Sequence, residues 1–93
     1  MKISIMEMRV AIHQTHDCEA TVCLGVSKVK TEQESDDVEV YLFQIDGHPS
    51  ASYCFAWGVE YSASKMGIPA VLMTESIKTA DDAVRAWKQT HMS

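Results

Sequence analysis

The sequence predicts an α+β fold. About five antiparallel strands form a meander that can curl, and a C-terminal helix packs on one face of the sheet. Residues 38–61 hold two runs rich in aromatic and β-branched residues on either side of Asp46-Gly47, which is typical of a β-hairpin. Residues 79–91 repeat apolar residues at helical spacing. A chain of 93 residues is expected to be a single domain, 1–93.

Two segments before the hairpin show the alternation expected of half-buried strands. Within residues 3–13, one predicted strand face carries Met6, Met8, Val10 and Ile12. Within residues 20–30, the corresponding face carries Ala20, Val22, Leu24 and Val26. Polar residues 14–19 connect these two predicted strands, and the acidic residues 31–37 are expected to form a loop.

The hairpin itself pairs residues 38–45 with residues 52–61. The first run is apolar on both faces in its second half, which indicates a central strand covered on both faces or a contact with a partner chain. Residues 62–69 are expected to form a loop or one short helical turn, and residues 70–77 a fifth strand.

The C-terminal helix has a clear start and a clear buried face. Thr79 and Asp82 have the spacing of a capping box. One apolar stripe follows the i, i+3, i+4, i+7 rule and contains Ala80, Ala83, Val84, Trp87 and His91. Trp87 is therefore expected to anchor the helix in the core.

The predicted sheet is too wide for one helix. Five strands span roughly 20 Å, whereas a helix with its side chains is about 10–12 Å wide. The sheet must then curl, take a second helical turn from residues 62–68, or pair with another subunit. The two-faced apolar pattern of residues 38–61 favours a homo-oligomer, with a dimer as the first choice.

Charge is distributed unevenly along the chain. The net charge is −5, and no Lys or Arg occurs between Lys30 and Lys65, a stretch with seven acidic residues. This composition argues against a nucleic-acid-binding face there, because phosphate contacts need Lys and Arg. The acidic stretch is either a solvated loop or a site that docks a basic partner protein, with candidate contacts at Glu32, Glu34, Asp36 and Asp37.

Membrane insertion and secretion are not expected. No apolar run approaches the roughly 18–20 residues that span a bilayer, and Glu7 and Arg9 interrupt the apolar residues near the N-terminus. The three cysteines include no CxxC pair. We therefore expect a cytoplasmic protein with reduced thiols.

The aromatic residues of the hairpin suggest a second kind of site. Aromatic walls with a few polar groups suit a cleft for a small molecule, although a core or a subunit interface is the more ordinary role of such residues. The candidate ligand-binding residues are Tyr41, Phe43, His48, Tyr53, Trp57 and Tyr61.

Catalytic and metal chemistry have weaker support. The densest group of metal-ligand types is His13, His16, Asp17, Cys18 and Cys23, but its spacing matches no zinc pattern. A pair of His48 and Cys54 lacks a nearby cation in sequence to lower the thiol pKa. We expect no metal and no cofactor, and an enzyme using His48 or residues 13–18 is the least favoured alternative.

The leading hypothesis is a non-enzymatic, oligomeric binding or interaction module whose contact surface lies on the 38–61 sheet. One alternative is a small-molecule-binding protein with an aromatic-lined cleft. Another is an inhibitor or antitoxin-like protein whose acidic stretch docks a basic partner.

Overall fold

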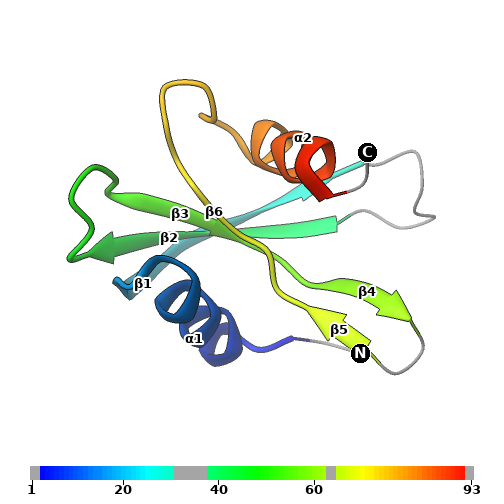
Figure 1. Cartoon of the computed structure of the whole chain (residues 1–93), viewed down its shortest axis with the longest axis horizontal. Helices are drawn as coiled ribbons and strands as arrows, with labels where there is room; N and C mark the ends of the chain where they lie inside the picture. Colours follow the sequence, from blue (N-terminus) through cyan, green and yellow to red (C-terminus); the bar gives the residue numbers. More distant parts are fainter. Residues whose placement is uncertain (1–2, 31–37, 63–64, 92–93) are drawn as a thin grey trace.

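A central sheet of four antiparallel strands has one helix on each of its faces (Figure 1). The computed structural model describes residues 3–30, 38–62 and 65–91. In chain order the elements are α1 (Ile5–His16), β1 (Glu19–Val29), β2 (Val38–Asp46), β3 (Tyr53–Ala56), β4 (Val59–Ser62), β5 (Lys65–Gly67), β6 (Ala70–Leu72) and α2 (Ala80–His91). The sheet order is β1-β2-β3-β6, while β4 and β5 form a separate hairpin. The predicted α+β class, with an antiparallel sheet and a C-terminal helix, is confirmed.

The first element is a helix, so the strand predicted for residues 3–13 is wrong. Ser4 and Glu7 form a capping box: the Ser4 hydroxyl oxygen accepts from the Glu7 N–H at 3.1 Å, and a Glu7 carboxylate oxygen accepts from the Ser4 N–H at 3.4 Å. Met8 and Ile12, one turn apart, are buried, whereas Val10 between them is exposed. Alternating apolar residues can also place an i, i+4 pair on one helix face, and here the cap favours the helix.

β1 occupies nearly the predicted range, but its faces differ from the prediction. Thr21 and Leu24 have no partner residue on β2, so each forms a bulge and interrupts the alternation. Ala20 is buried, whereas Val22, Leu24 and Val26 are 50–54% exposed. The single apolar face predicted for residues 20–26 is therefore absent.

The hairpin of β2 and β3 is confirmed. Tyr41 lies opposite Ala56 and Phe43 opposite Cys54, and Gly47 in the connection has φ 89°, a conformation that favours glycine. The second run is shorter than predicted, because β3 ends at Ala56 and the chain leaves the sheet to form β4. Residues 62–69, predicted as a loop or helical turn, contribute to β4 and β5, and β6 covers only the start of the strand predicted at 70–77.

Two hydrophobic cores lie on opposite faces of the sheet. The α1-side core consists of Met8, Ile12, Cys18, Ala20, Phe43, Ile45, Cys54 and Ala56. The α2-side core consists of Val29, Val40, Phe55, Trp57, Ala80, Ala83, Val84 and Trp87. β2 contributes to both, so the prediction of a central strand covered on both faces is confirmed. The chain covers the second face of the sheet with its own α1. The sequence had suggested instead that the sheet curls, is covered by a turn from residues 62–68, or pairs with a partner subunit.

α2 follows the sequence prediction closely. The Thr79 hydroxyl accepts from the Asp82 N–H at 3.2 Å, and the Asp82 carboxylate accepts from the N–H groups of Lys78 and Thr79 at 3.1 and 3.2 Å. The rings of Trp87 and Trp57 meet edge to face with their centroids 6.1 Å apart. Trp87 thus anchors α2 in the core, as predicted.

The cap of α2 predicts a pH-dependent stability. The Lys78 N–H, together with Thr79, lowers the pKa of Asp82 below the ordinary value of 3.8. A group with a lowered folded-state pKa contributes stability above its unfolded pKa and loses it as pH falls through the folded value. Asp82→Asn should therefore be less stable than the parent above about pH 5, and the difference should shrink below about pH 4.

Thermal melts followed by circular dichroism between pH 7 and pH 2 would measure that difference. Asp81→Asn is the matched control, because the Asp81 carboxylate accepts none of these cap hydrogen bonds. A difference between parent and Asp82→Asn that stays constant from pH 7 to pH 2 would contradict the prediction.

Within residues 3–30, 38–62 and 65–91, neither helix is long and apolar enough to cross a membrane.

Candidate interaction surface

Exposed apolar side chains gather on the two N-terminal elements. Among the described residues, six large hydrophobic side chains of α1 and β1 are roughly half exposed or more. We call them the N-terminal apolar surface: Ile5, Met6, Val10, Val22, Leu24 and Val26. Such residues favour contact with another molecule when they are grouped, whereas single exposed apolar residues need no explanation.

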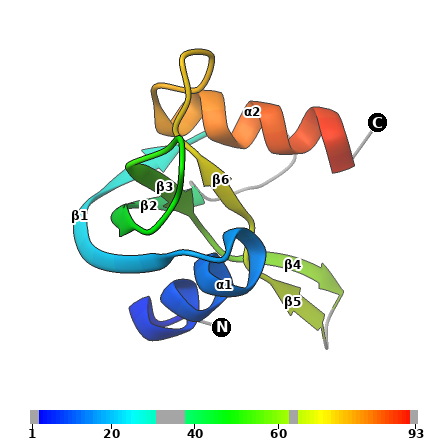
Figure 2. The same ribbon diagram turned by 60° about the vertical axis from the view of Figure 1, so that its left-hand side comes forward.

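β1 contributes a free sheet edge to this surface. It is the first strand in the sheet order, and only β2 pairs with it in the described part of the chain. Its ends are held by the two cores, through Ala20 on the α1 side and Val29 on the α2 side. Between these ends, every residue from Thr21 to Lys28 except the half-buried Cys23 is exposed. The middle of β1 therefore lies outside the cover of both helices (Figure 2).

α1 contributes a ridge between two grooves. Met6 and Val10, one turn apart, line both grooves. The groove between α1 and β1 has a volume of about 310 Å³ and also contains Arg9, His13 and Glu19. The groove on the other flank of α1 has a volume of about 530 Å³ and is bounded by Gly67 and Ile68. The outer face of α1 is thus apolar along its ridge and polar at its rims.

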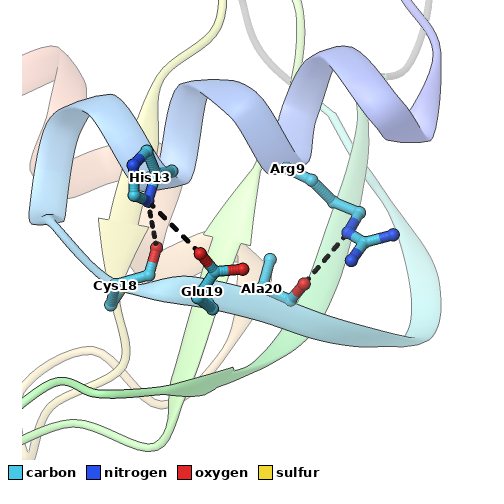
Figure 3. A network of polar contacts seen from close by, with 5 residues as sticks. All are labelled: Arg9, His13, Cys18, Glu19 and Ala20. Carbon is cyan, nitrogen blue, oxygen red and sulfur yellow. Dashed lines mark hydrogen bonds and ion pairs between the residues drawn. The ribbon is translucent and has the colours of Figure 1, made fainter.

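Polar contacts fix α1 against the start of β1 (Figure 3). The Arg9 Nε donates to the Ala20 carbonyl oxygen at 2.9 Å. The His13 Nδ1 lies 3.2 Å from the Cys18 carbonyl oxygen and 3.8 Å from a Glu19 carboxylate oxygen. These contacts hold α1 against the first residues of β1.

The aromatic residues predicted to line a ligand cleft do not converge. Phe43 is completely buried in the α1-side core, and Trp57, 1% exposed, is buried in the α2-side core on the opposite face of the sheet. Tyr41 is half-buried, with its hydroxyl donating to the Glu39 carboxylate at 3.3 Å, and Tyr53 is exposed. The side chain of Tyr61 is not among those that the structure describes. Ligand binding by these residues stays a prediction.

His48 has a structural role in the loop between β2 and β3. Its Nδ1 accepts from the N–H groups of Ser50 and Ala51 at 3.1 and 3.0 Å. Its ring lies edge to face with that of His16, with centroids 6.4 Å apart, and the His16 Nε2 is 2.7 Å from the Ala70 carbonyl oxygen. The predicted ligand residue His48 therefore ties the loop together.

The thiols of the α1-side core are not activated. Cys54 is completely buried, and burial raises its pKa to about 12, so its thiolate is scarce at neutral pH. Burial also raises the pKa of Cys18, with a smaller contribution from the charge of Asp17. In the described ranges, no three His, Cys, Asp or Glu side chains converge into a group that could hold a metal ion.

The acidic stretch lies outside the described residues, which resume at Val38. Docking of a basic partner by Glu32, Glu34, Asp36 and Asp37 therefore stays a prediction.

Comparison with protein families, characterised proteins and solved structures finds no match to this chain. The sequence did not single out Val22, Leu24 and Val26 as surface residues, because their alternation resembles that of a buried strand face. The capping box of Ser4 and Glu7 was the available signal for α1. A helix starting there places Met6 and Val10 on the face that points away from the sheet.

Proposed function

We propose that the protein is a non-enzymatic interaction module that works as a homo-oligomer and uses the N-terminal apolar surface as its contact surface. The observation that supports this most directly is the exposed middle of β1, an edge strand with apolar residues where edge strands of monomeric proteins usually carry charges. The buried thiols and the structural role of His48 favour a binding role over catalysis.

The proposed surface differs from the one expected at residues 38–61. β2 and β3 supply buried residues to both cores, and the two helices of the same chain cover their faces. The free surface lies instead on α1 and on the strand next to β2. We therefore propose α1 and β1 as the elements that carry the contact surface.

The size of the surface is adequate for a reversible oligomer. Burying the exposed half of a Val, Leu, Ile or Met side chain contributes roughly 1 kcal/mol. Six such side chains from each of two copies contribute on the order of 10 kcal/mol, against an association cost of about 4–15 kcal/mol. Further contacts, such as backbone hydrogen bonds, then decide the affinity.

Light scattering behind size exclusion, over a dilution series, would test the proposal. The wild type should elute with at least twice the 10.4 kDa mass of the chain at high concentration. Val22→Thr combined with Leu24→Asn should weaken self-association about tenfold or more, because both side chains lose apolar contact.

Tyr53→Ser is the matched control, since Tyr53 is an exposed apolar residue outside the proposed surface. Circular dichroism would verify that each variant keeps its fold. A wild type that stays monomeric at every concentration would overturn the homo-oligomer, and unchanged self-association in the double variant would overturn the surface.

A further inference from the structure

Three segments that are distant in sequence meet at a pair of histidine rings. His16 is the last residue of α1, His48 lies in the loop between β2 and β3, and Ala70 is the first residue of β6. The two rings are edge to face with centroids 6.4 Å apart, and the His16 Nε2 lies 2.7 Å from the Ala70 carbonyl oxygen. Both histidines are half-buried. The two rings therefore connect the end of a helix, a loop and a strand at the edge of the sheet.

The hydrogen bonds of His48 require one protonation state. Its Nδ1 accepts from the Ser50 N–H at 3.1 Å and from the Ala51 N–H at 3.0 Å. An imidazole nitrogen that accepts a hydrogen bond carries no proton, so His48 is neutral with its proton on Nε2. A protonated imidazole is a donor at both nitrogens. Protonation therefore breaks both bonds, although the protonated Nδ1 can donate to the Ser50 hydroxyl, 3.5 Å away.

The hydrogen bond of His16 does not depend on its charge. A carbonyl oxygen only accepts, so the His16 Nε2 donates to Ala70 whether the ring is neutral or protonated. His16 also lies in the last turn of α1, where the final carbonyl groups of a helix favour a positive charge. A protonated His16 repels a positive charge on the neighbouring ring of His48. His48 is therefore the member of the pair whose contacts change on protonation.

The surroundings do not neutralise a charge on these two rings. Within the described part of the chain, the one imidazole–carboxylate pair closer than 4.0 Å is that of His13 with Glu19. Asp17 and Asp46, the acids nearest to the two rings in sequence, make no such contact. β6 contains no titratable residue, and raised pKa values keep the buried thiols of the α1-side core uncharged at neutral pH. Protonation of both rings therefore places two unneutralised positive charges side by side.

We infer that His48 is an acid-sensitive latch, which holds the loop between β2 and β3 beside the end of α1 at neutral pH and releases it at mildly acidic pH. Histidine changes its charge between about pH 5 and pH 8. Release affects residues 47–52, including Ala51, which packs against the α1-side core. The α2-side core contains neither histidine, so the opening is local. The latch is independent of the proposed self-association.

Nuclear magnetic resonance of the wild-type chain tests the latch directly. Imidazole nitrogen shifts at about pH 8 should show that His48 carries its proton on Nε2. The hydrogen-exchange protection of the Ser50 and Ala51 amides, corrected for intrinsic exchange, should fall roughly threefold to tenfold between about pH 8 and pH 5.5. Amides of β2 that pair with β1 should keep their protection. A proton on Nδ1 at about pH 8, or equal protection of both loop amides across this range, would overturn the inference.

Two substitutions separate the charge of His48 from its hydrogen bonds. An Asn side chain places its Oδ1 near the position of the histidine Nδ1, and it can accept from backbone N–H groups shortly after it without titrating. His48→Asn should therefore retain the protection of the loop amides and remove its dependence on pH. His48→Phe, which has no acceptor, should lose the protection already at neutral pH. A His48→Asn variant with the wild-type pH dependence would show that another group titrates and would overturn the latch.

Two substitutions on α1 serve as matched controls. Gln at position 16 can still donate to the Ala70 carbonyl but carries no charge, so His16→Gln should shift the loss of loop protection toward higher pH. His13→Gln should leave that loss unchanged, because His13 faces Cys18 and Glu19 instead. The pH range lies above the one in which Asp82 changes its charge, so the cap of α2 does not contribute. Loss of the pH dependence in His13→Gln would contradict the assignment to His48.

Discussion

Replacing Trp57 with alanine is expected to lower the free energy of unfolding by about 3–5 kcal/mol. The indole is 1% exposed in the α2-side core and meets the ring of Trp87 edge to face at 6.1 Å. Truncation removes buried apolar area and leaves a cavity that a close-packed interior fills only in part. Because a domain has about 5–15 kcal/mol of stability in total, this loss is a large fraction of it. Urea denaturation followed by circular dichroism would measure it.

Two further variants keep this prediction testable if Trp57→Ala does not fold. Trp57→Phe should lose less, and a cycle with Trp87→Phe should reveal a coupling of about 0.5–1.5 kcal/mol from the edge-to-face contact. Tyr53→Ala, at the exposed first residue of β3, is the control. A loss below about 1 kcal/mol for Trp57→Ala would mean that α2 is not anchored in this way.

The second large effect is expected at Ile12. Ile12→Ala should lower the free energy of unfolding by about 2–5 kcal/mol, because its side chain is completely buried between α1 and the sheet. Val10→Ala should change it by less than about 0.5 kcal/mol, since Val10 is 47% exposed on the outer face of the helix. Urea denaturation of the two variants at a concentration where the protein is monomeric would measure both values.

This pair of variants distinguishes a helix from a strand. A strand over residues 3–13 places Val10 and Ile12 on the same face and predicts similar losses. The helix places them 200° apart, by two steps of about 100°. Equal and large losses at both positions would contradict α1.

Local signals were sufficient for the hairpin and for α2. Asp46-Gly47 with its flanking runs gives the pairing of β2 and β3, and Thr79 with Asp82 gives the start of α2. The stripe that contains Trp87 gives its buried face. Each of these signals depends on residues close in sequence, so no knowledge of the rest of the fold is needed.

α1 and the faces of β1 could not be obtained from periodicity alone. Alternation from Met6 to Ile12 fits a strand, but it also contains the pair Met8 and Ile12 at helical spacing. The exposure of Val22 and Leu24 depends on bulges and on an edge position, and both arise from pairing with a distant segment.

The candidate sites show the same limitation. Phe43 lies on β2 and Trp57 directly follows β3, the other strand of the same hairpin, and the sequence suggested a common cleft. In a sheet covered on both faces, neighbouring strands supply side chains to both sides, and these two rings are separated by the sheet itself. Which layer covers which face is a tertiary property, and it decides between a cleft and a core.

Because one sheet separates the two cores, α1 and α2 are anchored by different residues. The tryptophan pair anchors α2, and the face of the sheet beneath α2 is occupied by that contact. α1 is held by Met8 and Ile12 in the other core, and by polar contacts of Arg9 and His13 to the start of β1. Residues on its outer face can therefore change without repacking the tryptophan layer. The outer face of α1 can therefore vary in sequence with little effect on either core.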